Sequence, residues 1–559
     1  MKKSLFATIL LLSAFCLSAQ PVSRLEVDAS VRVGPMDPIW AWFGYDEPNY
    51  TTMKNGRKLL SEIAELSSVP VRIRTHNLMT SGDGIAAMKW GSTNIYTEDA
   101  DGNPIYYWEI IDHIFDTFVD RGIKPLVEVG FMPEALTTAE THYRHHWSPE
   151  NQRDLFTGWT YPPSDYEKWA ELVYQWVRHS IDRYGQEEVE TWWWELWNEP
   201  DIGYWHGTPE EFCKLYDYTS EAIKRALPTA IVGGPDTTNP SGERAANYLK
   251  TFLDHCSEGT NYVTGRKGSH LDFIAFHAKG APTVVDGHVR MNAGAQLRAI
   301  DAGCGIVASY PRYKDLPIVI GESDPEGCAA CGMYTNPENA YRNGTMYSSY
   351  TAATFARKYE IAARHGVRLA GAVTWAFEFE DQPWFHGFRD LATNGVDKPV
   401  LNAFRMFGKM SGDRVAVKGN AYSLDEMLEG SVRDRDDVSA LASLSERSLA
   451  VMVWDYHDDN IPDWGSEVEV EVEVRISGIP VKKATLKHYR IDADHSNSYE
   501  AWLAMGSPQD PSPAQYKALE QAGKLAEFEP ARDVNIRKGS YTASFQLPRQ
   551  GTSLLLFEW

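Results

Sequence analysis

A repeated alternation between short apolar runs and longer amphipathic segments constrains the fold of this chain more than any other feature. The short runs are rich in the β-branched and aromatic residues that favour strands, and they are residues 38–44, 69–76, 124–131, 191–197, 230–234, 271–277, 317–323 and 370–377. Segments with helical spacing of apolar residues follow most of them, such as 54–66, 108–119 and 347–365. Ser164 and Glu167 have capping-box spacing and predict the start of a helix that ends near Tyr184. Eight strands alternating with helices predict an α/β fold, the (β/α)8 TIM barrel.

An open, doubly wound sheet is the alternative arrangement of the same elements. Its dinucleotide-binding members carry a Gly-rich turn after the first strand. Here Gly44 is followed by Tyr-Asp-Glu-Pro, and no such turn occurs before the helical segment at residue 54. The barrel is therefore our prediction.

The sequence pattern changes after residue 412. Residues 467–476 alternate between charged and β-branched residues, which is typical of an antiparallel strand with one buried face. Further strand-like runs continue to the C-terminus, so we predict an accessory antiparallel β-sandwich domain over residues 413–559. Residues 20–36 contain a lone strand that we expect to join this sandwich, which leaves residues 37–412 for the catalytic barrel.

Residues 1–19 have the composition of a signal peptide. Lys2 and Lys3 precede an apolar stretch, and the small residues Ser18 and Ala19 precede Gln20. The apolar stretch is too short for a good membrane span, and no later segment resembles a membrane helix. We expect export to the periplasm or the medium, cleavage near residue 19 and no membrane partner.

The charge balance bears on the partners of this chain. It has 54 Lys and Arg against 77 Asp and Glu, a formal net charge of −23 at pH 7. A nucleic-acid partner would require a basic surface that neutralises phosphates, so none is expected. The sequence predicts no oligomeric state.

The six cysteines are too few for a disulfide-rich scaffold. Cys328 and Cys331 have the spacing of a metal knuckle or a redox pair, but no second pair accompanies them. This isolation favours a local disulfide or two free thiols over a metal site.

Chemistry-bearing side chains gather at the C-terminal ends of the predicted barrel strands, where TIM barrels carry their active sites. They are His76, Asn198, Glu199, His277, Lys279, Glu322 and Trp375. A single histidine or glutamate at a strand end is more often structural or solvated than catalytic. Glu199 and Glu322, however, end the fourth and seventh strands, which lie on roughly opposing sides of a barrel mouth, so their carboxyl groups are expected to converge.

Two converging carboxyl groups satisfy the requirement of glycoside hydrolysis. One donates a proton to the leaving oxygen, while the other attacks the anomeric carbon or activates a water molecule. Asn198 is placed to bind a ring hydroxyl, and Trp375 to stack against the sugar. The Glu-flanked histidine pair of zinc hydrolases is absent from the sequence, so no metal site is predicted. The alternative function is a non-catalytic, carbohydrate-binding barrel.

Several motifs resemble those of glycoside hydrolase family 39, the β-xylosidase and α-L-iduronidase family. They are Arg74-Thr-His76, Trp197-Asn-Glu-Pro200, Gly233-Gly-Pro235, Asp272 to Ala281, Glu322-Ser-Asp-Pro325 and Lys398 to Phe404. Segments 256–265 and 492–506 are similar to the α-L-iduronidase branch, to which the chain bears the closer resemblance. The resemblance covers nearly all of the chain after the signal peptide.

The resemblance implies a retaining exo-glycosidase that needs no cofactor. Its substrate would be an oligosaccharide or polysaccharide with a terminal xylo-configured sugar. Glu199 would be the acid/base and Glu322 the nucleophile. The glycone site would be lined by His76, Asn198 and His277, together with Asp381 and Arg389.

Lys279 bears on the choice of sugar. By the resemblance to the α-L-iduronidase branch, it would meet the carboxylate of a uronic-acid glycone. A buried ammonium without an anion would carry a desolvation cost, which favours this interpretation. The alternative is that Lys279 pairs with a neighbouring glutamate, such as Glu378 or Glu380.

Overall fold

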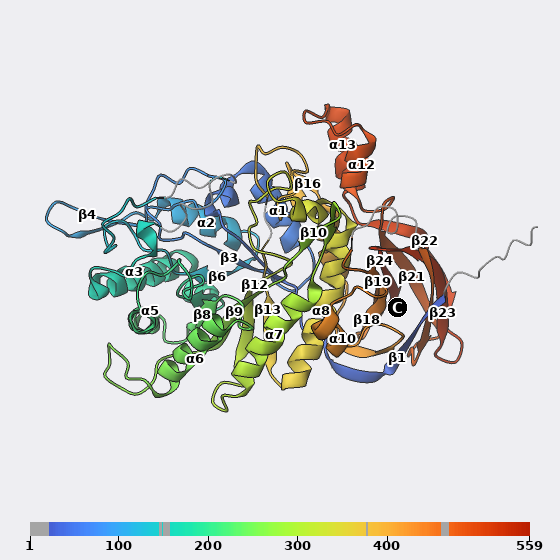
Figure 1. Cartoon of the computed structure of the whole chain (residues 1–559), viewed down its shortest axis with the longest axis horizontal. Coiled ribbons are helices and arrows are strands. Elements are labelled where there is room, and N and C mark those ends of the chain that lie inside the picture. The colour runs from blue at the N-terminus through green and yellow to red at the C-terminus, as the bar shows by residue number, and fades with distance from the viewer. Residues whose placement is uncertain (1–21, 145–147, 149–156, 376–377, 460–468) are drawn as a thin grey trace, which may run out of the picture.

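The chain forms two parts that pack side by side (Figure 1). The computed structural model describes residues 22–144, 148, 157–375, 378–459 and 469–559. The predicted signal peptide, the predicted end of the eighth strand at residue 377 and the start of the alternating run at residue 467 lie outside these residues. None of the helices in the described part of the chain is long and apolar enough to cross a membrane.

The first part is the predicted (β/α)8 barrel. Its parallel strands are β2 (Trp42–Tyr45), β3 (Arg72–Thr75), β6 (Lys124–Glu128), β7 (Trp193–Glu195), β8 (Ile231–Thr237), β9 (Phe273–Lys279), β12 (Pro317–Asp324) and an eighth strand in two pieces, β13 (Arg368–Ala372) and β14 (Thr374–Trp375). The sheet order runs β13-β12-β9-β8-β7-β6-β3-β2-β14. Because β13 pairs with β12 and β14 pairs with β2, the eighth strand closes the barrel.

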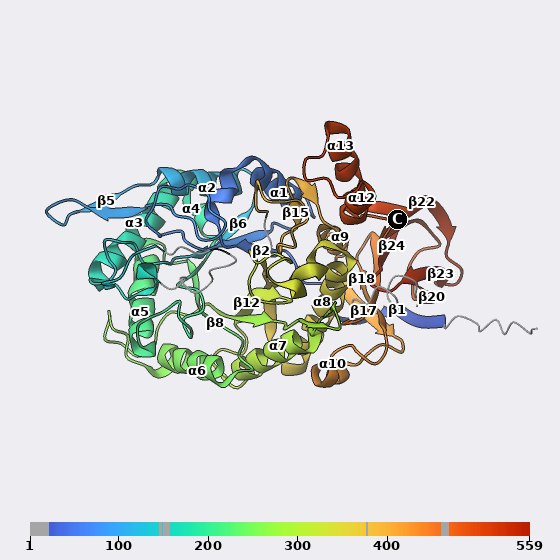
Figure 2. The same cartoon turned by 45° about the horizontal axis from the view of Figure 1, so that its top comes forward.

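Helices surround the barrel strands (Figure 2). They are α1 (Lys54–Ala64), α2 (Glu109–Val119), α3 (Tyr166–Tyr184), the short α4 (Gln186–Val189), α5 (Pro209–Ala226), α6 (Glu243–Glu258), α7 (Ala293–Ala308), α8 (Thr345–His365) and α9 (Pro399–Phe407). Smaller elements lie in the loops: β4 (Tyr96–Glu98), β5 (Pro104–Tyr106), β10 (Thr283–Val285), β11 (His288–Arg290), β15 (Ala392–Thr393), β16 (Val396–Asp397), η1 (Pro48–Thr52), η2 (Gly158–Thr160) and η3 (Pro337–Asn343).

Two local features differ from the sequence prediction. Helix α3 is capped by Asp165, whose carboxylate accepts the amides of Glu167 and Lys168, and not by Ser164. Helix α7 was not predicted, because Ala and Gly positions blur its apolar stripe. Its Gly303 lies against Phe276, where an added Cβ would come within 2.3 Å of the ring. Helix α7 can therefore approach β9 this closely only with glycine at position 303, although glycine is a weak helix former.

The tryptophan-rich strand β7 is packed on both of its faces. Outside the barrel, the ring of Trp194 lies 5.7 Å from that of Trp176 on α3. Inside the barrel, at the N-terminal end of β7, Trp193 packs against Trp42 and Phe273. The ring centroids of Trp193 and Trp42 are 5.2 Å apart. These rings serve the core.

The second part is built on a separate mixed sheet. Its strands are β1 (Val22–Pro35), β17 (Asp413–Lys418), β18 (Asp437–Leu444), β19 (Ser448–Tyr456), β20 (Glu469–Ser477), β21 (Lys483–Ile491), β22 (Ala526–Asn535), β23 (Tyr541–Pro548) and β24 (Thr552–Glu558). Strand β1 pairs with β17 in antiparallel fashion and with β20 in parallel fashion. Helices α10 (Leu424–Gly430), α12 (Ser498–Ala504) and α13 (Pro513–Ala522) lie in the connections.

The sheet of the second part encloses its own apolar core. Alternate residues of β20 are buried, including Val472 and Val474, and they join apolar residues of β1, β19 and β23 in one cluster. We propose residues 37–412 as the barrel domain, and β1 with residues 413–559 as a sandwich-like second domain.

Helix α8 joins the two parts. It is buried along almost its whole length, because one side faces the barrel and the other faces β18, β19 and β24. Tyr350 lies edge-on to Tyr456 of β19, with ring centroids 5.8 Å apart. The Ser349 hydroxyl donates to the side-chain oxygen of Gln550 at 2.6 Å.

Candidate active site

The polar residues predicted at the strand ends lie at one mouth of the barrel. His76 follows β3, Asn198 and Glu199 follow β7, and Glu322 lies near the end of β12. All strands of the barrel are parallel, so their C-terminal ends meet at the same rim. Glu199 has a φ of 43°, in the left-handed region that residues other than glycine rarely adopt. Its amide donates to the carbonyl oxygen of Asp236 at 3.0 Å, which holds this turn in place.

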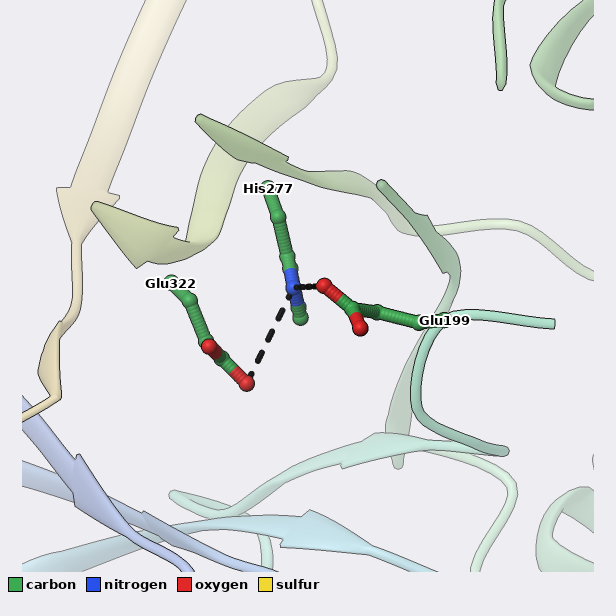
Figure 3. A group of neighbouring side chains, drawn as sticks. All are labelled: Glu199, His277 and Glu322. Atoms are coloured by element: carbon green, nitrogen blue, oxygen red, sulfur yellow. Dashed lines mark hydrogen bonds and ion pairs between the residues drawn. The ribbon is translucent and has the colours of Figure 1, made fainter. Parts of the chain in front are cut away.

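Glu199 and Glu322 point toward each other, with His277 beside both (Figure 3). His277 Nδ1 lies 2.8 Å from Glu199 Oε1 and 3.8 Å from Glu322 Oε1. One oxygen of each carboxylate and one nitrogen of the imidazole all lie within 4.8 Å of one another. The structure thus brings together the two carboxyl groups that the sequence placed on separate strands.

Lys279 lies between the two carboxylates. Its Nζ is 2.5 Å from Glu322 Oε2 and 3.3 Å from Glu199 Oε1. Lys279 therefore pairs with glutamates, as the sequence-based alternative expected, but the two partners named there, Glu378 and Glu380, are wrong. Glu378 accepts the amide of Gly395, and Glu380 accepts amides at the N-terminus of α1.

Both carboxylates are held in the charged form. Burial alone would raise the pKa of Glu199, but the attraction of Lys279 and His277 outweighs it and lowers that pKa to about 2. Burial also raises the pKa of Glu322, but Lys279 and His277 outweigh it and hold that pKa well below its ordinary value. Glu322 Oε1 also lies 3.5 Å from His76 Nε2 and 3.6 Å from Arg74 Nη1. Glu322 therefore has more cationic neighbours than Glu199.

A fully buried arginine supports the site from below. Arg74 Nη2 lies 2.8 Å from Glu128 Oε2, and the guanidinium also pairs with Glu195 and Asp236. Burial raises the pKa of Glu195 well above its ordinary value, against the pull of Arg74. The pKa of Asp236 is lowered, because Arg74 and His277 outweigh its burial.

Sequence reasoning missed these three buried carboxyl residues. Glu128 interrupts the valines of the third strand, and Glu195 interrupts the tryptophan-rich run. An acidic residue inside an otherwise apolar strand was the available signal, since a buried charge needs a partner.

The two histidines connect these buried carboxyl groups to Glu199 and Glu322. His76 Nδ1 lies 2.6 Å from Glu128 Oε2, and His277 Nε2 lies 3.2 Å from Asp236 Oδ2. Burial lowers the pKa of His277, but Asp236 and Glu322 outweigh it and raise that pKa to about 10. The pKa of His76 is also raised, because Glu128 outweighs the effect of burial. His277 is therefore a cation at neutral pH.

These groups open into a small cavity of about 210 Å³. It is lined by Asp46, His76, Lys89, Asn198, Glu199, Ile202, Tyr204, Lys279, Glu322, Gly327, Cys328, Ala329 and Trp375. Drug-sized pockets usually measure roughly 300–1,000 Å³, so this cavity suits a single sugar ring.

Trp375 forms an aromatic wall of the cavity. Its ring lies 4.4 Å from the His76 ring, and Arg74 Cζ lies 5.1 Å from its centroid. An added Cβ at Gly44 would come within 2.5 Å of the Trp375 ring, so β2 needs a glycine where it passes this side chain.

Asp46 and Lys89 line the cavity and were not predicted. Asp46 directly follows β2, so the same rule that selected the other strand-end residues applied to it. Lys89 comes from the long connection between β3 and β4, where no sequence signal distinguished it from a solvated lysine.

Two residues assigned to the glycone site by resemblance do not lie in this cavity. Asp381 is exposed. Arg389 is fully buried behind the cavity wall, where its Nη2 lies 3.4 Å from Asp324 Oδ2 and its Nη1 donates to the carbonyl of Gly327 at 2.8 Å. The loop after the eighth strand thus directs Arg389 into a buried carboxylate network and leaves Asp381 in solvent.

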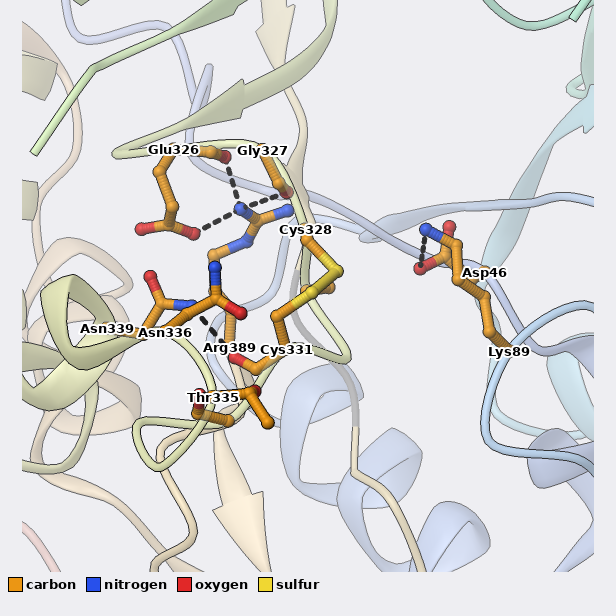
Figure 4. Close-up of a disulfide and its surroundings, with 12 residues drawn as sticks. Asp46, Lys89, Glu326, Gly327, Cys328, Cys331, Thr335, Asn336, Asn339 and Arg389 are labelled. Carbon is orange, nitrogen blue, oxygen red and sulfur yellow. Dashed lines mark hydrogen bonds and ion pairs between the residues drawn. A yellow bond between two sulfur atoms is a disulfide. The ribbon is translucent and has the colours of Figure 1, made fainter. Parts of the chain in front are cut away.

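A disulfide between Cys328 and Cys331 borders the cavity (Figure 4). Cys328 lines the cavity together with Gly327 and Ala329. The buried Arg342 donates to the carbonyls of Cys328 and Cys331, each at 2.8 Å. The wall after β12 is therefore fixed by a covalent link and by hydrogen bonds to an arginine. Of the other described cysteines, Cys213, Cys256 and Cys304 are buried free thiols.

Glu199, His277 and Glu322 are spaced closely enough to hold a metal ion, and no other such group occurs among the described residues. The Lys279 ammonium already lies beside both carboxylates and offsets part of their charge. A protonated lysine and a cationic imidazole next to the two glutamates suit an acid–base site better than a cation site.

Comparisons with known proteins agree with this geometry. A family model described as Glycosyl hydrolases family 39 matches residues 23–536. A β-xylosidase from Caldicellulosiruptor saccharolyticus is 26% identical over 517 residues, which cover 91% of this chain and 93% of that protein. An α-L-iduronidase from Mus musculus is 23% identical over 536 residues, which cover 89% of this chain and 75% of that protein. The crystal structure of a monomeric β-xylosidase from Caulobacter crescentus superposes with a TM-score of 0.74 at 21% identity, covering 96% of this chain and 99% of that one. At this identity the last similarity shows the fold alone.

Proposed function

The chain belongs to glycosyl hydrolase family 39 and is an O-glycosyl hydrolase, and from this premise we propose that it removes a terminal xylo-configured sugar with retention of configuration. The small size of the cavity supports exo action on an oligosaccharide or polysaccharide. The Cys328–Cys331 disulfide supports export, because disulfides persist in oxidising compartments.

The separation between Glu199 and Glu322 carries the proposal. Retaining glycosidases hold their two carboxyl groups about 5–5.5 Å apart, whereas inverting enzymes leave about 6.5–9.5 Å for a water molecule. The nearest oxygens of Glu199 and Glu322 lie within 4.8 Å of each other. This spacing supports direct attack on the sugar by one of the two carboxylates.

The environments of the two glutamates favour Glu322 as the nucleophile. Its charge is stabilised by Lys279, His277, His76 and Arg74, while Glu199 has only the first two beside it. A carboxylate oxygen of Glu322 attacks the anomeric carbon as the bond to the leaving oxygen breaks. Glu199, which takes up a proton from solvent as the substrate complex forms, gives that proton to the leaving oxygen, so the first product leaves as an alcohol.

The second half of the reaction reverses these roles. The Glu199 carboxylate takes a proton from water, and the water oxygen attacks the anomeric carbon. The bond to Glu322 breaks, which restores its carboxylate and leaves Glu199 protonated. Two inversions at the same carbon give net retention.

The neutral xylo sugar is our first candidate glycone, and an α-L-iduronide is the second. Lys279 and the similarity to an α-L-iduronidase favour the second. However, Lys279 already contacts two carboxylates, and Asp46 adds a further acidic side chain to the cavity wall. A substrate carboxylate would have to compete with these anions.

The test is turnover of 4-nitrophenyl β-D-xylopyranoside and 4-methylumbelliferyl α-L-iduronide, with the configuration of the first-formed product read by NMR. We expect the xyloside to be cleaved to β-xylose, with no loss of rate in EDTA. Formation of α-xylose would contradict retention, and activity abolished by chelation would replace the proposal with metal-dependent chemistry. Faster cleavage of the iduronide, lost more strongly than xylosidase activity in Lys279→Met, would establish the second candidate.

Lys279→Met is expected to shift the alkaline limb of the kcat profile, which reports the substrate complex, to higher pH. Catalysis begins once Glu199 has taken up a proton in the substrate complex, although the empty site favours its charged form, and Lys279 is the charge that lowers its pKa most. Removing the ammonium raises that pKa, so Glu199 keeps its proton to higher pH and the limb moves by about one pH unit or more. Profiles measured with xylobiose, whose sugar leaving group needs the acid, would test this. Lys214→Met, on α5 outside the cavity, is the control, and an unmoved limb in Lys279→Met would contradict the role.

A further inference from the structure

Asp46 and Lys89 form a charged pair on the cavity wall, across the cavity from Cys328 (Figure 4). Asp46 is 6% exposed and the Lys89 side chain 9% exposed. Lys89 Nζ lies 4.8 Å from the centroid of the Trp90 ring, which covers one side of the ammonium. Neither residue takes part in the double displacement, so their presence in the cavity needs another explanation.

Asp46 and Lys89 are too far apart to form a hydrogen bond with each other. Lys89 Nζ lies 3.8 Å from Asp46 Oδ2, and His76 Nε2 lies 3.6 Å from Asp46 Oδ1. Both distances exceed those of a hydrogen bond. Within the part of the chain that the structure describes, the Asp46 carboxylate therefore has charged neighbours but no hydrogen-bond donor.

A buried carboxylate without donors is costly, and such groups normally accept hydrogen bonds from protein, water or ligand. A sugar hydroxyl between Asp46 and Lys89 would donate to the carboxylate and accept from the ammonium. It would use both partners at once.

The position of the pair indicates which edge of the sugar it contacts. His76 Nε2 lies 3.5 Å from Glu322 Oε1 and 3.6 Å from Asp46 Oδ1. Both carboxylates thus approach the same nitrogen from different sides of the cavity, and Asp46 Oδ1 lies at most about 7 Å from Glu322 Oε1, a gap that one pyranose ring with its hydroxyls can span. With the anomeric carbon at Glu322, the far edge of the ring, C3 and C4, lies toward Asp46.

We propose that Asp46 and Lys89 form a hydroxyl-recognition pair for the C3–C4 edge of the glycone, and that they select a neutral sugar there. The inference rests on the proposed glycosidase function and adds to it the residues that set sugar specificity. Asp46 and Lys89 line the cavity, whereas Asp381 and Arg389, which the sequence resemblance assigned to the glycone site, are not among its lining residues.

Neutrality follows from the charges around the cavity. Each of its two lysines already lies near a carboxylate, Lys279 beside Glu199 and Glu322 and Lys89 beside Asp46. An anionic substituent at C3 or C4 would meet the Asp46 carboxylate directly. A hydroxyl meets no such repulsion.

The experiment combines variants of the pair with modified substrates. The probes are 4-nitrophenyl β-D-xylopyranoside, its 3-deoxy and 4-deoxy analogues, and the C4 epimer 4-nitrophenyl α-L-arabinopyranoside. The variants are Lys89→Met and the isosteric Asp46→Asn. Lys214→Met is the matched control, because Lys214 also lies over an aromatic ring, 4.0 Å from the centroid of Tyr166, but outside the cavity.

In the wild type we expect kcat/KM to fall about 10- to 100-fold for at least one deoxy analogue, the loss of a hydrogen bond to a charged group. Lys89→Met and Asp46→Asn should lose a similar factor on the xyloside and show almost no further loss on that analogue. In both variants, the ratio of kcat/KM for the xyloside to kcat/KM for its C4 epimer should also be smaller than in the wild type. The control should match the wild type on all four substrates.

Two results would overturn the inference in distinguishable ways. If the wild type cleaves the xyloside and the variants keep the full deoxy penalty, the pair recognises no hydroxyl, and the proposed function stands without it. If the wild type cleaves neither these probes nor the iduronide, the proposed function fails and the inference falls with it. Thermal melting of each variant separates lost recognition from lost folding.

Discussion

Glu322→Gln is expected to lower kcat on an aryl xyloside by on the order of 10⁵-fold or more, the scale on which removal of a covalent nucleophile acts. The amide keeps the shape of the side chain but cannot form the glycosyl ester. Neighbours such as Lys279 and His76 remain to hold the substrate, so binding should survive the loss of turnover. Steady-state kinetics and calorimetric binding of xylobiose to the variant would measure both effects.

Glu199→Ala is the companion variant that separates the two roles. An aryl leaving group needs little help from an acid, so the glycosyl-enzyme should still form and then accumulate, because no base activates water. Azide needs no base and should restore turnover, giving the β-azide. In a Glu322→Ala variant, rescue by azide would instead give the α-azide by a single inversion. A β-azide from the Glu322 variant and an α-azide from the Glu199 variant would exchange the two assignments.

Arg74→Met is expected to destabilise the barrel by on the order of 3–5 kcal/mol, the cost of removing one partner from a buried ion pair. Arg74 is the cation that Glu128, Glu195 and Asp236 share in the barrel interior. Without it, these buried carboxyl groups face one another. The midpoint of thermal unfolding should fall by several degrees, and catalysis should weaken because Glu322 loses one of its cationic neighbours.

The pH dependence of the stability lost in Arg74→Met provides a second test of this role. The pKa of Asp236 is depressed in the folded protein, so the stability that this pairing contributes is present above the pKa of the unfolded chain and is lost as the pH falls through the folded value. The difference in melting between wild type and Arg74→Met should therefore be larger at neutral pH than in acid. A difference that grows on acidification would contradict the assignment.

Arg72→Met is the matched control on the same strand. Arg72 lies two residues before Arg74, contacts the indole rings of Trp42 and Trp193 at 5.2 and 5.0 Å, and donates from Nη1 to the carbonyl of Thr191 at 2.9 Å. No carboxylate among the described residues forms an ion pair with it. Its loss should cost only about 1 kcal/mol, because methionine keeps much of the apolar contact. Equal destabilisation by the two variants would mean that the charges around Arg74 contribute little.

Much of the fold follows from local patterns in the chain. The alternation of strand-like and helix-like runs predicts the barrel, and the period-two run near residue 470 predicts a strand of the second part, since each pattern reflects which face of one element is buried. Helix α7 is the exception, because its packing against Phe276 selects glycine at position 303, and its sequence therefore resembles a loop.

The residue pattern alone predicts that Glu199 and Glu322 share one rim with His76, Asn198, His277 and Lys279. In a parallel barrel every strand ends at the same rim, so position along the strand is enough to predict proximity. Which groups touch was decided by the tertiary structure. Lys279 bridges the two glutamates, Arg389 turns away from the cavity, and Asp46 and Lys89 enter it from separate connections. The physical reason is that charge pairing depends on distances of a few ångströms between loops far apart in the chain, and only the closed barrel sets those distances.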